Sequence, residues 1–118
     1  LIVDQNLIKD KKEIINLFDH VLSNNKLKAE IENLIIFKKS LFYSNFASES
    51  ELLTSLKTLL NSDNLWKPHA LLLVGNYFFD KKEFVKAKEF YVQILSLKNL
   101  NKELYDQARS QLMLTSND

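Results

Sequence analysis

The sequence predicts an all-α fold of about six helices arranged as antiparallel pairs. The chain of 118 residues contains a single Gly and a single Pro, which leaves little turn punctuation for hairpins between strands. Apolar residues recur at three- and four-residue spacing along most of the chain, as they do on one face of a helix. The tetrapeptide Asp-Lys-Lys-Glu occurs at residues 10–13 and again at residues 80–83. This spacing indicates a helix–turn–helix unit that is repeated.

The N-terminal segment, residues 1–24, is predicted to be a partial repeat. Residues 10–13 are expected to form its hairpin turn, because the second copy of the tetrapeptide lies between two helical patterns. Residues 1–9 would then end the first helix of that repeat, and residues 14–22 would form the second helix. On this interpretation the chain opens inside a repeat, and a segment upstream of Leu1 is expected to be missing.

The next segment, residues 26–61, is predicted to be a divergent repeat. Its first helix should run over about residues 26–43, followed by a polar connection over residues 44–50. Ser48 is predicted to cap the second helix, with Glu51 three residues later completing a capping box. That second helix should end near Asn61.

Residues 68–97 form the best-defined repeat. Pro68 suits the first helical turn, where its missing N–H costs no hydrogen bond, and residues 80–82 form a short polar turn. Gly75 on the first helix and Ala87 on the second are small, so that the two helices can approach closely. The residues expected to pack between the two helices are Leu71, Val74, Gly75, Phe78, Phe84, Ala87, Tyr91 and Ile94.

A last amphipathic segment, residues 102–115, is predicted to be a capping helix. Tyr105, Ala108 and Leu112 should face the stack, and the polar residues between them should face solvent, as a terminal repeat requires.

The spacing within residues 68–97 resembles the tetratricopeptide signature W-x2-L-G-x2-Y…A-x3-F…P. The chain departs from the signature at Leu71, which replaces tryptophan, and at Asn99, where a proline is common. The resemblance implies a tetratricopeptide-like stack of helix pairs, wound as a short right-handed superhelix. It also implies a concave surface lined by the first helix of each pair.

A narrower resemblance involves Trp66 and the residues after it, together with residues 33–40, 84–95 and 107–109. These segments look like the soluble region of the bacterial ancillary translocon subunits, a family of membrane-anchored periplasmic tetratricopeptide proteins. The resemblance implies the periplasmic face of the inner membrane, with a membrane helix outside this chain and a role in secretion or periplasmic protein assembly. Without that resemblance, the expected compartment is the cytoplasm.

Composition and motifs argue against several other functions. The net charge is +1, with lysines interspersed among acidic residues, so nucleic-acid binding is not expected. The chain has no Cys, which excludes disulfides and thiolate metal sites. His20 and His69 have no second ligand one helical turn away, and Glu30 and Glu32 point to different faces of one helix. We therefore expect no catalytic residues, no metal and no cofactor.

The sequence instead predicts a non-enzymatic scaffold that binds a protein or peptide segment. The family resemblance implies that the Asn76 position hydrogen-bonds a bound peptide, whereas Leu72 replaces the basic residue of carboxylate-clamping members. Large apolar residues on the same helices suit an apolar or amphipathic partner. The alternative is that these residues are covered by an upstream part of the protein or by a second copy, which would make a self-associating structural domain, for example a homodimer. The predicted groove residues are Ile35, Lys39, Phe42, Tyr43, Leu72, Asn76 and Phe79.

Overall fold

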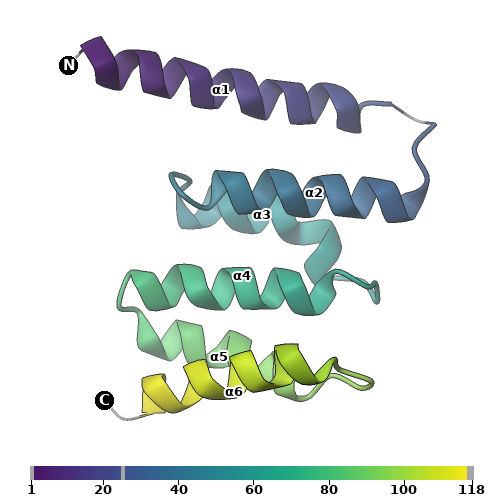
Figure 1. Cartoon of the computed structure of the whole chain (residues 1–118), viewed down its shortest axis with the longest axis vertical. Coiled ribbons are helices and arrows are strands. Elements are labelled where there is room, and N and C mark those ends of the chain that lie inside the picture. The colour runs from purple at the N-terminus through teal and green to yellow at the C-terminus, as the bar shows by residue number, and fades with distance from the viewer. Residues whose placement is uncertain (1, 25, 117–118) are drawn as a thin grey trace.

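The computed structural model describes residues 2–24 and 26–116, and in these ranges the chain is all-α with six helices and no strand. Consecutive helices pack against one another, consistent with a tetratricopeptide-like stack. In Figure 1 the stack runs from α1 at the top to α6 at the bottom, with α3 behind α2. The helices are α1 (Ile2–Leu22), α2 (Ala29–Tyr43), α3 (Glu49–Leu60), α4 (Lys67–Asp80), α5 (Phe84–Leu95) and α6 (Lys102–Ser116).

Each helix packs on its neighbours along the chain, and α4 also contacts α6. Ring contacts add a link between α2 and α4, because Phe37 of α2 stacks on Trp66 just before α4 at a centroid distance of 5.3 Å and meets the His69 ring of α4 edge-on. The phenol of Tyr77 on α4 donates a hydrogen bond to the Ala47 carbonyl in the α2–α3 loop, at 2.8 Å. The central helix α4 is therefore held from several sides.

The core contains the packing residues predicted for α4 and α5. Of the eight, all but Phe84 are buried, and Phe84 packs its ring edge-on against Phe79. A Cβ at Gly75 would lie 2.7 Å from Cε1 of the Tyr91 ring. Gly75 therefore makes room for the Tyr91 ring of α5.

Local signals set the ends of the helices as predicted. The Ser48 hydroxyl accepts the Glu51 N–H, and the Glu51 carboxylate accepts the Ser48 N–H, which completes the capping box of α3. Pro68 lies in the first turn of α4. After α4, Lys82 adopts φ 62°, and the Glu83 N–H bonds back to the Phe78 carbonyl to close the hairpin to α5.

The predicted hairpin turn at residues 10–13 is wrong, because α1 runs through this segment as one helix from Ile2 to Leu22. The tetrapeptide contains neither Gly nor Pro, so nothing in it ends a helix by itself. Its second copy becomes a turn where two packed helices meet, with Phe78 of α4 stacked on Phe90 of α5. Contacts between helices, rather than the tetrapeptide, decide the conformation.

Both end helices of the stack leave apolar residues exposed. On α6 the buried residues are Leu104, Ala108 and Thr115, whereas Tyr105, which was expected to face the stack, is 39% exposed. On α1 the apolar residues Ile14, Leu17 and Val21 are all exposed. Of the helices described, none is both long and apolar enough to cross a membrane.

Candidate functional site

A hollow of about 840 Å³ lies where the α3–α4 loop and the α5–α6 loop meet the starts of α4 and α6. Its walls include several leucines, of which Leu65 is 80% exposed and Leu104 is buried. Leu72 and His69 of α4 and Gln107 of α6 also line it. The apolar residues of the lining are Leu65, Pro68, Leu72, Leu97, Leu100 and Leu104.

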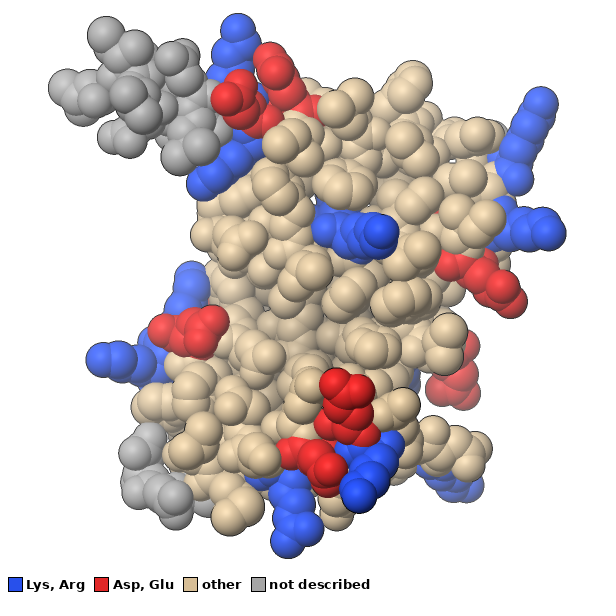
Figure 2. All heavy atoms as spheres, viewed as in Figure 1, with Lys and Arg blue, Asp and Glu red and all other residues tan. Residues whose placement is uncertain are grey.

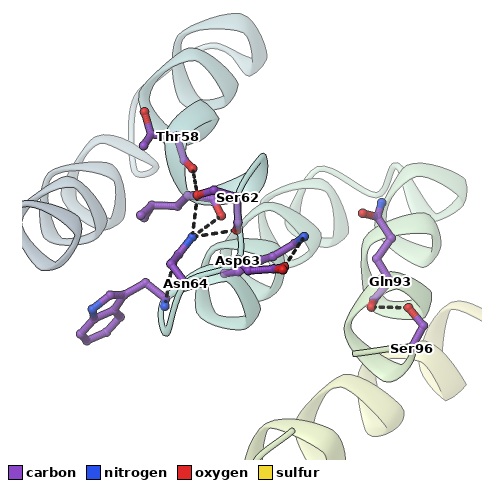
Figure 3. Close-up of polar contacts among 9 residues, drawn as sticks. Thr58, Ser62, Asp63, Asn64, Gln93 and Ser96 are labelled. Carbon is purple, nitrogen blue, oxygen red and sulfur yellow. Dashed lines mark hydrogen bonds and ion pairs between the residues drawn. The ribbon is translucent and has the colours of Figure 1, made fainter. Parts of the chain in front are cut away.

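Both loops at this end are held by their own polar side chains, as Figure 3 shows. The Ser62 hydroxyl donates to the Thr58 carbonyl at 2.9 Å, and the Asn64 amide donates to the Ser62 carbonyl at 2.9 Å. The Ser96 hydroxyl donates to the Gln93 carbonyl at 2.7 Å. The bonds to Thr58 and Gln93 satisfy carbonyls in the last turns of α3 and α5, so side chains of the chain itself hold the two loops that border the hollow.

The hollow has a balanced charge. Lys67 and Lys98 are matched by Asp63 and Glu103, and the Lys67 amine lies 3.9 Å from the Asp63 carboxylate. Burial lowers the pKa of His69, so this imidazole is neutral at neutral pH. More widely, Figure 2 shows Lys and Arg mixed with Asp and Glu over the face in view, among many uncharged residues. The face in view therefore has both signs of charge interspersed.

A cluster of three polar side chains lies one helical turn further along α4 and α6. The Tyr91 hydroxyl donates to Oδ1 of Asn76 at 2.7 Å, and Nε2 of Gln111 lies 3.4 Å from both of these oxygens. Burial is the main cause that raises the pKa of Tyr91, so its hydroxyl stays protonated and can donate. Both contacts use the carbonyl oxygen of Asn76, while its amide NH2 group donates to no side chain or carbonyl in the described part of the chain.

We define the α4–α6 face as Leu72 and Asn76 of α4 with Gln107 and Gln111 of α6. Residues four apart lie on one side of a helix, so Asn76 and Gln111 lie one turn beyond Leu72 and Gln107, which line the hollow. Gln107 is exposed, and in the part of the chain described its side chain makes no hydrogen bond. This face thus offers amide donors and acceptors beside a hollow whose lining combines leucines with four charged residues of balanced sign.

The structure does not gather all the predicted groove residues on this face. Lys39 pairs with Asp19 of α1 at 2.5 Å, and the Tyr43 hydroxyl donates to Glu51 of α3 at 2.7 Å. That bond is the main cause that raises the pKa of Tyr43 to about 12. Tyr43 also packs against the core.

The other predicted groove residues are also partly used in packing. Leu72 and Phe79 pack against the core, and Phe79 contacts Phe84 of α5. Phe42 and Ile35 are half-buried, and the Phe42 ring meets that of Phe46 edge-on. Only Leu72 and Asn76 of the predicted set belong to the α4–α6 face.

The contribution of α6 to this face was not predicted from the sequence. Gln107 and Gln111 are one helical turn apart, a spacing that marks one side of a helix, but nothing in the sequence links that side to Asn76. The buried hydrogen bond from Tyr77 to Ala47 was also missed, since it joins residues thirty positions apart.

The described residues include no group of three or more His, Asp or Glu side chains that could hold a metal ion. Comparison of the chain with protein families, with curated proteins and with solved structures found no match. The α4–α6 face is therefore interpreted from its own chemistry, which is that of hydrogen bonding and apolar contact.

Proposed function

We propose that the protein is a non-enzymatic scaffold of the tetratricopeptide type that binds a segment of a partner protein on its α4–α6 face. The observation that carries the proposal is the orientation of Asn76. Its carbonyl oxygen accepts from Tyr91 and Gln111, and within residues 2–24 and 26–116 its amide NH2 group makes no hydrogen bond, so this group can donate to a ligand one turn from Leu72 of the hollow. A side-chain amide that is already oriented loses little entropy on binding, and peptide groups are its natural partners.

Photocrosslinking tests this proposal. A photoreactive residue at Gln107 of the α4–α6 face is compared with one at Glu89, an exposed position on α5. The proposal expects a defined partner protein, identified by mass spectrometry, to be captured from Gln107 and not from Glu89. Equal capture from both positions, or none from Gln107, would remove the assignment of this face.

We further propose, from the resemblance carried by Trp66 and residues 107–109, that the scaffold is the soluble part of a bacterial envelope protein. In that setting it would assist secretion or periplasmic protein assembly. The full reading frame of the gene and fractionation of cells test this part separately. An apolar helix encoded upstream of Leu1 and recovery with the inner membrane are expected, and recovery from the cytoplasm without such a helix would contradict it.

One observation favours a second candidate function, a structural domain that associates with itself. Ile14, Leu17 and Val21 form an exposed apolar stripe on α1, and Leu17 is 65% exposed. Sedimentation distinguishes the two functions. A concentration-dependent dimer that Leu17→Lys abolishes supports self-association, whereas a monomer with or without this substitution supports the scaffold.

A further inference from the structure

The two end helices of the stack each leave one side uncovered. α1 packs on α2, and α6 packs on α5 and α4, so each end helix has its neighbours on one side. Figure 1 shows α1 and α6 at opposite ends of the stack, and α1 starts on the side where α6 ends, so the two helices run in opposite directions. A repeat stack normally ends in a helix with a polar outer side. Exposed apolar residues on these outer sides therefore favour a further neighbour at each end.

We define the α1 end surface as Ile14, Leu17 and Val21 with Asp10 and Glu13. The three apolar residues follow one another at three- and four-residue spacing, so they lie on one side of α1, and all three are exposed. Asp10 and Glu13 are exposed beside them, and neither carboxylate forms an ion pair with another described residue. The α1 end surface is therefore an apolar stripe with negative charge.

We define the α6 end surface as Tyr105, Arg109 and Met113 with Lys102. The first three residues are spaced by four, so they lie on one side of α6, and Met113 is 60% exposed. Lys102 and Arg109 are also exposed, and in the part of the chain that the structure describes neither forms an ion pair. The two cations outnumber the one carboxylate on this side, that of Asp106. The α6 end surface therefore combines apolar contact with positive charge.

The two end surfaces match in length and in charge. From Ile14 to Val21 the α1 axis rises by about 10.5 Å. From Tyr105 to Met113 the α6 axis rises by about 12 Å. Two helices that run in opposite directions can pack such stripes along their length, as consecutive helices of the stack do. The cations of α6 would then lie beside the carboxylates of α1, whereas two copies of one end surface would bring like charges together.

We propose that a second copy of this chain binds head to tail, with its α1 end surface packed on the α6 end surface of the first copy. The junction continues the stack and is heterologous, so each dimer keeps one free end surface of each kind. A junction between two single helices is a small interface, so the dissociation constant should be about micromolar or higher. This inference rests on the second candidate function, self-association, and names the two surfaces that meet. Because Gln107 and Tyr105 are two residues apart and face different sides of α6, the junction leaves the α4–α6 face open.

Complementation between two variants tests the proposal. Leu17→Lys changes the α1 end surface and Met113→Lys changes the α6 end surface, and both positions are exposed, so the core stays intact. In sedimentation the wild type should form dimers and then longer oligomers as its concentration rises. Each variant alone should stay monomeric over the same range, because a charge in place of an apolar contact raises the dissociation constant by roughly tenfold or more. A mixture of the two variants should form a one-to-one dimer and nothing longer, because each variant retains one intact end surface.

Val85→Lys on α5 is the matched control, since Val85 is 78% exposed and belongs to neither end surface. It should associate as the wild type does, and circular dichroism shows that each variant is folded. A mixture that stays monomeric, or a Met113→Lys variant that still dimerises, would overturn the head-to-tail junction, and the second result would show that two α1 end surfaces meet. A wild type that is monomeric at every concentration would overturn self-association as well. Capture of a partner from Gln107 is measured separately, so the proposed scaffold can stand in each of these cases.

Discussion

The contact between Gly75 and Tyr91 leads to the sharpest prediction about the fold. A methyl group at position 75 would lie 2.7 Å from Cε1, 3.0 Å from Cδ1 and 3.2 Å from Cζ of the Tyr91 ring. The ring cannot easily move aside, because it is fully buried and its hydroxyl is hydrogen-bonded to Asn76. Gly75→Ala should therefore strain the pairing of α4 with α5.

The magnitude follows from two opposing effects on the free energy of unfolding. Alanine inside a helix is more favourable than glycine by about 1 kcal/mol. Overpacking a core by one methyl group costs about 1–3 kcal/mol. We expect Gly75→Ala to be neutral or destabilising in the wild-type protein and stabilising by about 1 kcal/mol in a Tyr91→Leu background, where the ring is absent. The coupling between the two substitutions should be about 1–3 kcal/mol.

Urea unfolding followed by circular dichroism measures the four proteins of this double-mutant cycle. Lys88→Ala, at an exposed position of α5, is the control and should be additive with Tyr91→Leu. Additivity of Gly75→Ala with Tyr91→Leu to within about 0.5 kcal/mol would refute the reasoning, because the benefit of alanine would then be the same with and without the ring.

Three further predictions concern hydrogen bonds. Tyr77→Phe leaves the Ala47 carbonyl without its donor, so the free energy of unfolding measured in urea should fall by about 1–3 kcal/mol. An unchanged free energy of unfolding would show that this hydrogen bond does not stabilise the contact of α4 with the α2–α3 loop. Hydrogen bonds from the Ser48 N–H and the Tyr43 hydroxyl lower the pKa of Glu51 in the folded protein. A pKa that is lower in the folded state stabilises the fold at pH above the ordinary value of 4.5, and this stability is lost as pH falls through the folded pKa. Glu51→Gln should therefore reduce the fall in melting temperature as the pH is lowered. A variant whose melting temperature falls with pH as much as that of the wild type would contradict this. The pKa of Tyr43 is raised to about 12, so this group stabilises the fold fully below pH 10.0, and that stability is lost as pH rises toward 12. Tyr43→Phe should therefore reduce the loss of thermal stability at alkaline pH. A variant whose melting temperature still falls as steeply above pH 10.0 would argue against this.

The fold was predictable where local signals and helical spacing agree. The scarcity of Gly and Pro indicated helices, Ser48 and Glu51 marked the start of α3, and the spacing around Gly75 identified the core of the α4–α5 pair. These features depend on residues within one helix or in two helices joined by a short turn, so the sequence carries them directly.

The rest depends on contacts between distant segments. The hairpin expected at residues 10–13 is absent, because a turn-compatible tetrapeptide stays helical when no second helix packs back on it. The residues of the predicted groove have different neighbours in the structure. Lys39 pairs with Asp19 of α1, and Tyr43 donates a hydrogen bond to Glu51 of α3. Helical spacing shows which residues share a side of a helix, but it does not show which neighbour covers that side.

Hydrogen–deuterium exchange of the protein with and without the partner captured from Gln107 tests the central claim most directly. If the partner binds on the α4–α6 face, protection should increase in α4 and α6 and in the loops at residues 61–66 and 96–101, while α1 should exchange as before. Added protection confined to α1, where Leu17 is exposed, would contradict the claim and would move the binding surface to the other end of the stack.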